Sequence, residues 1–370
     1  MISLNLFELR KSRGITQSYL AEIIGVSFQT ISKWETGMAV PDVKYVVALA
    51  KFFGVTTDQI LGLQPLEYDY FSRMTENDEY WNDKLHYIQS SRYELWNSDY
   101  IEFLVQKVWK IENKVDVLDF GCGNGYLAGL IMPFLPKGST YTGIDVSDVM
   151  IREAKKIYAD AKYPVKFICK NAYHYKEKEK YDMVICQAFL RELSKPEKAL
   201  KNMIYSLKIQ GLIVCVEVDR ELDNAGTYIE GLDYSSILMT ELQRKYWTAE
   251  LEQSDRDYAV GIRLPFLLRN LGIKNIEVRV QDKVRFANPD NREEYGRLQA
   301  AYVSEKGWEK DNSEGDKRAV EVLMNRGLAR EEAEQLTQNW RKMKEKIVKE
   351  KKAFLKTTGF LITFGRKVEA

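Results

Sequence analysis

Apolar residues occur in five short runs through the middle of the chain, and stretches with helical spacing separate these runs. The runs are VDVLDF, YTGIDV, VKFICK, YDMVICQA and LIVCVEVD. The helical stretches cover residues 125–135, 147–160 and 195–208. Strands that alternate with helices build βαβ units and a parallel sheet. From residue 114 onwards we therefore predict an α/β domain.

Beyond the fifth run the pattern continues with helical stretches at 227–254 and 261–271 and with two further strands, NIEVRVQDKVRF and GFLITFGRK. A charged insert separates these strands. It holds apolar residues at steps of three and four, which predicts a helix with one apolar face. These residues are Ala333, Leu336, Trp340, Met343 and Ile347. We expect helical insertions at about residues 222–260 and 290–356.

The first 65 residues carry short helical patterns and end at GLQP. Thr16 precedes QSYLAEIIG and Ser27 precedes FQTISKWETG, and both residue types are good helix N-caps. Gly25 and Val26 would form the turn between the two helices. In this arrangement the second helix can enter a major groove of DNA while the first crosses the backbone.

This segment resembles the helix-turn-helix domains of the lambda-repressor and Cro family, also called the XRE family. The positions that carry the resemblance are Ala21, Gly25, Val26, Ile31, Trp34 and Pro41. The resemblance implies a DNA-binding domain over residues 1–65. It implies that the residues facing the groove or the phosphates are Gln17, Ser27, Phe28, Gln29, Thr30 and Lys33. Gln29 is the best candidate for specificity, because an amide can bond adenine through two hydrogen bonds.

Six basic residues against five acidic ones in this block neutralise few phosphates, so we expect useful affinity to require a homodimer on a two-fold site in double-stranded DNA. The alternative is a helical module that binds protein or has lost DNA binding. Residues 66–113 form an aromatic-rich segment, with 11 aromatics between residues 66 and 109. We expect a helical cap over an apolar pocket there, and plain core packing is the alternative.

VDVLDFGCGNG is a strand that runs into a glycine loop, with Gly121, Gly123 and Gly125 at alternate positions. A dinucleotide-binding loop needs its third glycine one position later, where Tyr126 stands. Asp119 lies just before the loop, and Asp145 follows 20 residues after Gly125. The Asp119 carboxylate suits an ammonium group, and the Asp145 carboxylate suits the hydroxyls of a ribose. Both fit S-adenosylmethionine, an adenosine with a cationic amino-acid tail.

Residues 114–220 resemble the class I methyltransferases, in the group that includes the ubiquinone and menaquinone biosynthesis enzymes. The resemblance implies a Rossmann-like sheet with a helical cap, which would occupy residues 114–370. It also implies that cofactor contacts come from Asp119, Gly121, Cys122, Gly123, Asp145, Val146, Met150, Asn171, Ala172, Gln187 and Ala188. Arg92 would reach the cofactor carboxylate from the preceding segment. The family usually has Asp where Asn171 stands, and an amide oxygen can still bond the adenine amine.

Many relatives have a histidine after the fourth strand, where this chain reads Leu190-Arg191-Glu192-Leu193. There is no NPPY or DPPY run and no Pro-Cys nucleophile, so a small methyl acceptor is expected rather than a DNA base. A sulfonium methyl group is already electrophilic, and aligning the acceptor can suffice. Candidates for a catalytic base, by position alone, are His174, His86, Tyr93 and Glu217. Packing, surface exposure or strand capping are their alternative roles.

The overall charge of +1, from 55 basic and 54 acidic residues, means that any nucleic-acid affinity must be local. Eight Lys or Arg with two acids between residues 341 and 356 favour a solvated helix face over a nucleic-acid contact. We expect a cytoplasmic chain, because no apolar window approaches the roughly 18 residues of a membrane span and the start does not suit a signal peptide. Four cysteines without metal-site spacing, at 122, 169, 186 and 215, predict buried thiols and no metal site.

Two functions fit these features. The first is an S-adenosylmethionine-dependent methyltransferase that acts on a small molecule and is joined to a DNA-binding domain, as in a transcriptional regulator. The second is a transcription factor whose methyltransferase-like domain only senses S-adenosylmethionine or S-adenosylhomocysteine.

Overall fold

A computed structural model describes residues 4–12, 16–53, 55–63, 95–254, 257, 259–305 and 313–369. The chain divides into two compact units, residues 1–75 and residues 76–370. Within the described ranges, no helix combines the length and the apolar character that a bilayer span requires.

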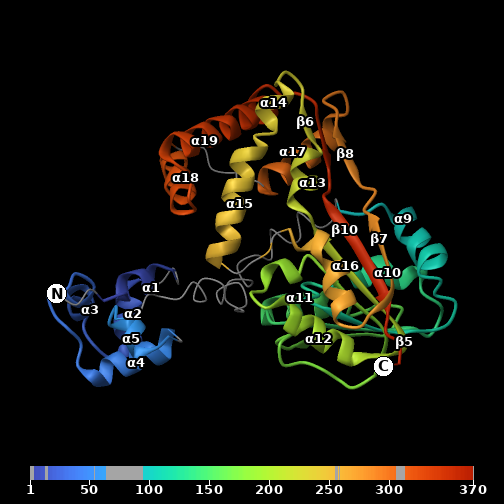
Figure 1. Cartoon of the computed structure of the whole chain (residues 1–370), viewed down its shortest axis with the longest axis horizontal. Helices are drawn as coiled ribbons and strands as arrows, with labels where there is room; N and C mark the ends of the chain where they lie inside the picture. Colours follow the sequence, from blue (N-terminus) through green and yellow to red (C-terminus); the bar gives the residue numbers. More distant parts are fainter. Residues whose placement is uncertain are drawn as a thin grey trace. The chain divides into compact units, whose positions relative to one another are not determined.

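Five helices form the described part of the first unit (Figure 1). They are α1 (Leu6–Ser12), α2 (Gln17–Ile24), α3 (Phe28–Glu35), α4 (Val43–Phe53) and α5 (Thr57–Ile60). The Thr16 side chain accepts from the backbone N–H of Tyr19, and Ser27 accepts from that of Thr30. Gly25 ends α2 with a φ of 75°, which is the left-handed conformation that glycine tolerates. The predicted caps and turn are therefore confirmed.

The first unit has its own apolar core, to which Leu20, Ile31 and Leu49 contribute fully buried side chains. A buried ion pair joins two of its helices. Arg10 of α1 donates from Nε and Nη2 to the two carboxylate oxygens of Glu35 at the end of α3, and the Nη2···Oε2 distance is 2.9 Å. A buried pair of this kind fixes the relative position of two helices, and removing one partner leaves an uncompensated charge.

A seven-stranded sheet forms the centre of the second unit, in the order β3-β2-β1-β4-β5-β10-β7. Its strands are β1 (Asp116–Phe120), β2 (Thr140–Asp145), β3 (Val165–Cys169), β4 (Tyr181–Gln187), β5 (Leu207–Val218), β7 (Lys274–Val280) and β10 (Phe360–Arg366). The first five strands are parallel, and β10 lies antiparallel between β5 and β7. The predicted α/β fold is confirmed.

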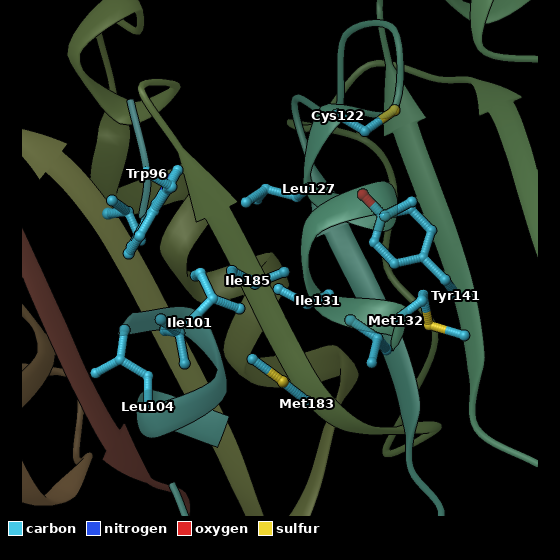
Figure 2. Packing of buried hydrophobic residues seen from close by; sticks show 14 of the residues in the cluster. Trp96, Ile101, Leu104, Cys122, Leu127, Ile131, Met132, Tyr141, Met183 and Ile185 are labelled. Carbon is cyan, nitrogen blue, oxygen red and sulfur yellow. The ribbon is translucent and has the colours of Figure 1, made fainter. Parts of the chain in front are cut away.

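Helices cover both faces of this sheet. One face packs against α9 (Ser98–Phe103), a π-helical turn (Leu104–Val108), α10 (Tyr126–Ile131) with a 3-10 turn (Met132–Phe134), and α11 (Asp148–Ile157). The other face packs against α12 (Pro196–Ser206), α16 (Val260–Asn270) and a 3-10 turn (Leu190–Glu192). Figure 2 shows Ile101 of α9, Ile131 of α10 and Ile185 of β4 within the first of these cores.

A cap lies beyond the carboxyl end of β5 (Figure 1). Its helices are α13 (Arg220–Ala225), α14 (Tyr234–Ile237), α15 (Thr240–Ser254), α17 (Arg292–Glu305), α18 (Ser313–Asn325) and α19 (Arg330–Lys344), which a π-helical turn (Glu345–Lys349) extends. On α19 and this turn, the predicted apolar face is confirmed, because Ala333, Leu336 and Ile347 are fully buried.

Besides the helices, the cap holds a three-stranded antiparallel sheet in the order β6-β9-β8, which the sequence pattern did not predict. Its strands are β6 (Thr227–Ile229), β8 (Val284–Ala287) and β9 (Phe354–Thr357). The run NIEVRVQDKVRF is likewise two strands instead of one, since β7 belongs to the large sheet and β8 to the cap. Residues 281–283 connect them.

Segment 95–100 joins the large sheet to the cap. Gln281 donates its side-chain N–H to the backbone oxygen of Leu95 over 2.6 Å, and its side-chain oxygen accepts from the hydroxyl of Thr358 over 2.7 Å. Gln281 and Thr358 lie in the two connections between the sheets, and both are buried. The two connections and segment 95–100 are thus fixed to one another by satisfied buried hydrogen bonds.

Candidate functional site

The glycine loop that follows β1 is hydrogen-bonded to the end of β2. The backbone N–H groups of Gly121 and Cys122 both donate to the carbonyl of Ile144, at 2.9 and 3.0 Å. The N–H of Gly123 donates to a carboxylate oxygen of Asp145 over 2.9 Å. Parallel strands end at the same edge of the sheet, so this loop and Asp145 form one surface.

The three glycines of the loop meet different surroundings, although all have positive φ values, from 53° to 82°. A side chain at Gly125 would come within 2.9 Å of the rings of Phe167 and Tyr158, and one at Gly121 would overlap the ring of Phe189. At Gly123 a side chain would meet no atom within 4 Å. The loop is therefore closely packed behind Gly121 and Gly125 and faces open space at Gly123.

Asp119, at the end of β1, is 1% exposed and accepts a hydrogen bond from the hydroxyl of Tyr141. Burial, together with the charge of Asp119, raises the pKa of Tyr141 well above its usual range. Burial and the charges of Asp145 and Asp119 likewise raise the pKa of the Cys122 thiol. Both groups stay neutral, so the charge beside the loop is that of two carboxylates. Such a site suits hydroxyl or ammonium groups and disfavours a pyrophosphate.

A cavity of about 500 Å³ opens at the carboxyl ends of β2 and β3. Its lining includes Val146, Asn171 and His174, so the fold brings these three predicted residues together. The Asn171 side-chain oxygen accepts from the N–H of Tyr173 over 2.8 Å, within the turn that follows β3. His174 is exposed at the cavity wall. The cavity therefore offers an apolar residue, an amide and an imidazole for recognition of a planar ring.

Other predicted cofactor residues support this cavity from behind. Met150 is 1% exposed, and its N–H donates to the hydroxyl of Ser147, the N-cap of α11. The second carboxylate oxygen of Asp145 accepts from the N–H of Ser147 over 2.8 Å. The carbonyl of Ala172 accepts from the side chain of Asn202 over 2.8 Å. These bonds fix the backbone that carries Asp145 and Ala172. Cys169 also lines the cavity, and its exposed thiol corrects the prediction that all four cysteines are buried.

The end of β4 is held by a residue that the sequence pattern did not single out. The indole N–H of Trp96 donates to the side-chain oxygen of Gln187 over 2.8 Å, and both side chains are buried. Ala188, the next residue, has a φ of 48°, and its N–H donates to Val216 in β5. A non-glycine residue in this conformation is strained and needs surrounding contacts to hold it. Trp96 belongs to the aromatic-rich segment, which was the only sequence signal for it.

Phe189 was also missed, because an aromatic residue after a buried strand is usually part of the core. Its ring covers Gly121 of the glycine loop. It therefore packs behind the glycine loop, against the core between the ends of β1 and β4.

Glu217, near the end of β5, is fully buried. One of its carboxylate oxygens accepts from the backbone N–H groups of Phe189 and Leu190, at 2.8 and 2.6 Å. Burial raises the pKa of Glu217 to about 7, against the opposing effect of these hydrogen bonds and of Arg191. Its carboxyl group holds the turn that presents Phe189 to the glycine loop.

Three of the predicted residues, His86, Arg92 and Tyr93, lie outside the described residues. At the position where many relatives have a histidine, Arg191 and Glu192 form an ion pair with an N···O distance of 3.1 Å. Among the described candidates for a base, Glu217 is bound into a turn and His174 lies at the cavity.

In the first unit, Phe28, Gln29 and Lys33 of α3 are exposed. The hydroxyls of Ser27 and Thr30 bond each other over 2.8 Å. The amide of Gln17 donates to Glu35 over 2.7 Å. The predicted groove-facing residues of α3 are thus accessible, whereas Gln17 takes part in the ion-pair cluster between the helices.

Residues 6–60 match the helix-turn-helix family, and residues 111–260 match a methyltransferase domain family. The parallel order β3-β2-β1-β4-β5 is typical of class I methyltransferases. The chain joins a helix-turn-helix domain to a class I methyltransferase domain. The interval between the two matches, residues 61–110, contains all 11 aromatics of the aromatic-rich segment.

The methyltransferase domain is similar to a malonyl-(acyl-carrier protein) O-methyltransferase of Acetivibrio thermocellus, with 29% identity over 102 residues, or 28% of this chain and 35% of that protein. The helix-turn-helix domain is 41% identical over 59 residues to the HTH-type transcriptional activator BcrR of Enterococcus faecalis, or 16% of this chain and 29% of that protein. This chain thus spans about a third of the length of these relatives.

Among solved structures, phosphoethanolamine N-methyltransferase 2 of Haemonchus contortus in complex with S-adenosyl-L-methionine gives a TM-score of 0.44 at 14% identity. The similarity covers 81% of this chain and 60% of that one.

Proposed function

We propose that the chain is an S-adenosylmethionine-dependent methyltransferase for a small molecule, and that its helix-turn-helix domain binds a specific DNA sequence and makes it a transcriptional regulator. The observation that carries the first half is the glycine loop held by Asp145 beside the cavity at Asn171. Open space at Gly123, two carboxylates and a cavity for a planar ring match the three parts of this cofactor.

The parts of the cofactor would meet residues at the carboxyl ends of β1, β2, β3 and β4. The residues that would contact the methionine part are Asp119, Gly121, Cys122 and Gly123. Asp145 would bind the ribose hydroxyls, since each of its two oxygens accepts one backbone hydrogen bond, from Gly123 or from Ser147, and keeps a further lone pair. The residues that would surround the adenine are Val146, Met150, Asn171 and Ala172. The residues that would close the site are Gln187 and Ala188.

The bound cofactor supplies an electrophilic methyl group, so the protein mainly has to align the acceptor and exclude water. Trp96 and Gln187 contribute by keeping the end of β4 in place with a buried hydrogen bond. The cap lies beyond the same end of the sheet and would shield the acceptor. The named similarity to an O-methyltransferase supports an oxygen atom as the methyl acceptor.

Calorimetry with S-adenosylhomocysteine tests the cofactor site. Asp145→Ala should abolish binding, because it removes the ribose acceptor and releases Gly123. The matched control is Asp148→Ala, at a half-exposed carboxylate in the first turn of the adjacent α11. Equal affinities of the two variants would overturn the assignment.

Gel-shift assays over the promoter of the chain's own gene test the DNA-binding domain. We expect a salt-sensitive complex that a Gln29→Ala change weakens at particular base pairs, with two copies bound to a two-fold site. A Glu22→Gln change on α2 provides the comparison. Identical base preference for Gln29→Ala and the parent chain would refute the role of Gln29.

Sensing of S-adenosylmethionine or S-adenosylhomocysteine without methyl transfer is the second candidate function. The observation in its favour is the Arg191–Glu192 pair where relatives have a histidine, together with the use of Glu217 inside a turn. Labelled S-adenosylmethionine with a cell extract separates the two. Transfer to an extractable small molecule supports catalysis, whereas cofactor-dependent DNA affinity without transfer supports sensing.

A further inference from the structure

Strand β7 forms an open edge of the large sheet. Among the described residues it pairs with β10 alone, and six of its seven residues are exposed. Val280 is 59% exposed and Val278 is 38% exposed. An unpaired edge with apolar side chains offers hydrogen-bonding groups to another strand.

The hydrogen-bond pattern shows which backbone groups of β7 point outward. The N–H of Gln281 donates to Phe360 of the neighbouring chain segment over 3.0 Å. In an antiparallel ladder the inward-bonding residues alternate, so Arg279 and Glu277 also bond β10. This register holds from Glu277 to Gln281, so the backbone groups of Val278 and Val280 face outward; beyond Glu277 it shifts at a bulge. The hydroxyl of Tyr100 donates to the carbonyl of Val280 over 3.0 Å, so this outward carbonyl already has one donor within the chain and would accept from a second strand through its other lone pair.

The side chains of β7 match those of a second β7 when the two strands run antiparallel. A two-fold axis through Val278 would place the outward groups of Val278 opposite the same groups of a second copy. The same axis places Glu277 opposite Arg279 of the second copy, twice. Charged side chains on an edge usually prevent pairing. Here their order gives opposite charges in both cross-strand positions, which favours pairing.

The helix beside this edge adds an apolar flank. Ile276 packs against the core that includes α16, so the side chains of Ile276, Val278 and Val280 lie on the α16 face of the sheet. On α16 itself, Ile262 is 53% exposed and Phe266 is 58% exposed, one helical turn apart. In a two-fold pair both copies of α16 would lie on the same face, where these side chains could be covered.

We propose that β7 pairs antiparallel with β7 of a second copy of this chain and extends the sheet from one copy into the other. The salt bridge that Glu277 and Arg279 form within one strand, at 2.9 Å, is then replaced by two salt bridges between the copies. The pairing supplies the dimer that the proposed binding to a two-fold DNA site requires. It does not depend on methyl transfer, on cofactor or on DNA.

Light scattering of the full chain during size-exclusion chromatography, across a dilution series, tests the proposal without cofactor or DNA. We expect the parent chain to be a dimer. Glu277→Arg and Arg279→Glu should each raise the dimer dissociation constant about tenfold or more, because each creates two like-charge pairs. The double variant Glu277→Arg/Arg279→Glu restores opposite charges and should recover dimerisation.

Val278→Pro gives an independent check. Proline removes the outward N–H, which the ladder with β10 does not use, and edge strands tolerate such a residue. It should yield a monomer whose circular dichroism and affinity for S-adenosylhomocysteine match those of the parent chain. A monomeric parent chain would overturn the proposal. A dimer that neither charge reversal weakens would also overturn it, because this result is expected if the copies pair through the helix-turn-helix domain. If the parent chain itself does not bind S-adenosylhomocysteine, the result would instead contradict the proposed function.

Discussion

Replacing Glu217 with Gln should change how the stability of the methyltransferase domain depends on pH. The carboxyl group is fully buried and accepts two backbone hydrogen bonds with one oxygen, and the structure gives its other oxygen no hydrogen-bond partner among the described residues. Gln keeps a carbonyl oxygen for the two N–H donors but cannot ionise. The change therefore separates the charge of Glu217 from its hydrogen bonds.

The size of the effect follows from the pKa of Glu217, which burial raises from 4.5 to about 7. At about 1.36 kcal/mol for each pH unit, this difference corresponds to roughly 3 kcal/mol. Because the folded state binds the proton more tightly than the unfolded state, this stabilisation is complete below pH 4.5 and is lost as the pH rises through about 7. The free energy of unfolding of Glu217→Gln should therefore rise relative to the parent chain over this window.

Urea unfolding between pH 4.5 and 8.5, followed by tryptophan fluorescence, measures this difference. A constant offset in the free energy of unfolding between the two chains reports the effect of the buried amide. The change of this difference with pH reports the ionisation of the carboxyl group. Glu241→Gln, at an exposed position of α15, is the control for the substitution itself. A difference between Glu217→Gln and the parent chain that stays flat across this range would refute the assignment of a proton to the buried group at acidic pH.

Three further changes should lower stability by distinct mechanisms. Gly125→Ala should cost about 1–3 kcal/mol in urea unfolding, because the residue needs a φ of 82° and a side chain would clash with two aromatic rings; unchanged stability would contradict this packing. Trp96→Phe should cost about 1–3 kcal/mol by leaving the buried oxygen of Gln187 without its donor, and full stability of this variant would argue against the bond. Arg10→Met should destabilise the helix-turn-helix domain by about 3–5 kcal/mol, since Glu35 stays buried; a melt in which adding Glu35→Leu fails to restore stability would count against it.

Features that depend on local sequence were predictable. Thr16 and Ser27 mark helix starts because a capping side chain bonds residues only three positions away. The strands β1 to β5 were recognisable because strands buried on both faces are continuous apolar runs. Asn171 was expected in the cofactor site from the resemblance to class I methyltransferases, and the structure places it in the lining of the cavity.

Features that depend on distant partners were not predictable. β6 has three residues and β8 has four, which is too short for an alternating pattern. Lys356 belongs to a basic run expected to face solvent, yet it is 1% exposed and paired with Asp223. It is buried because its strand, β9, lies between β6 and β8. The bond between Trp96 and Gln187 joins residues 91 positions apart, and no spacing rule indicates it.

The position of β10 has a consequence for how the chain folds during synthesis. β5 is buried along most of its length, and one of its two edges is completed only by β10, which begins 142 residues after β5 ends. β9, which precedes β10, is likewise needed to join β6 and β8. While the ribosome translates the cap, the emerging chain therefore exposes an apolar strand edge of the kind that aggregates or recruits chaperones. Completion of both sheets depends on the same short segment, residues 354–366.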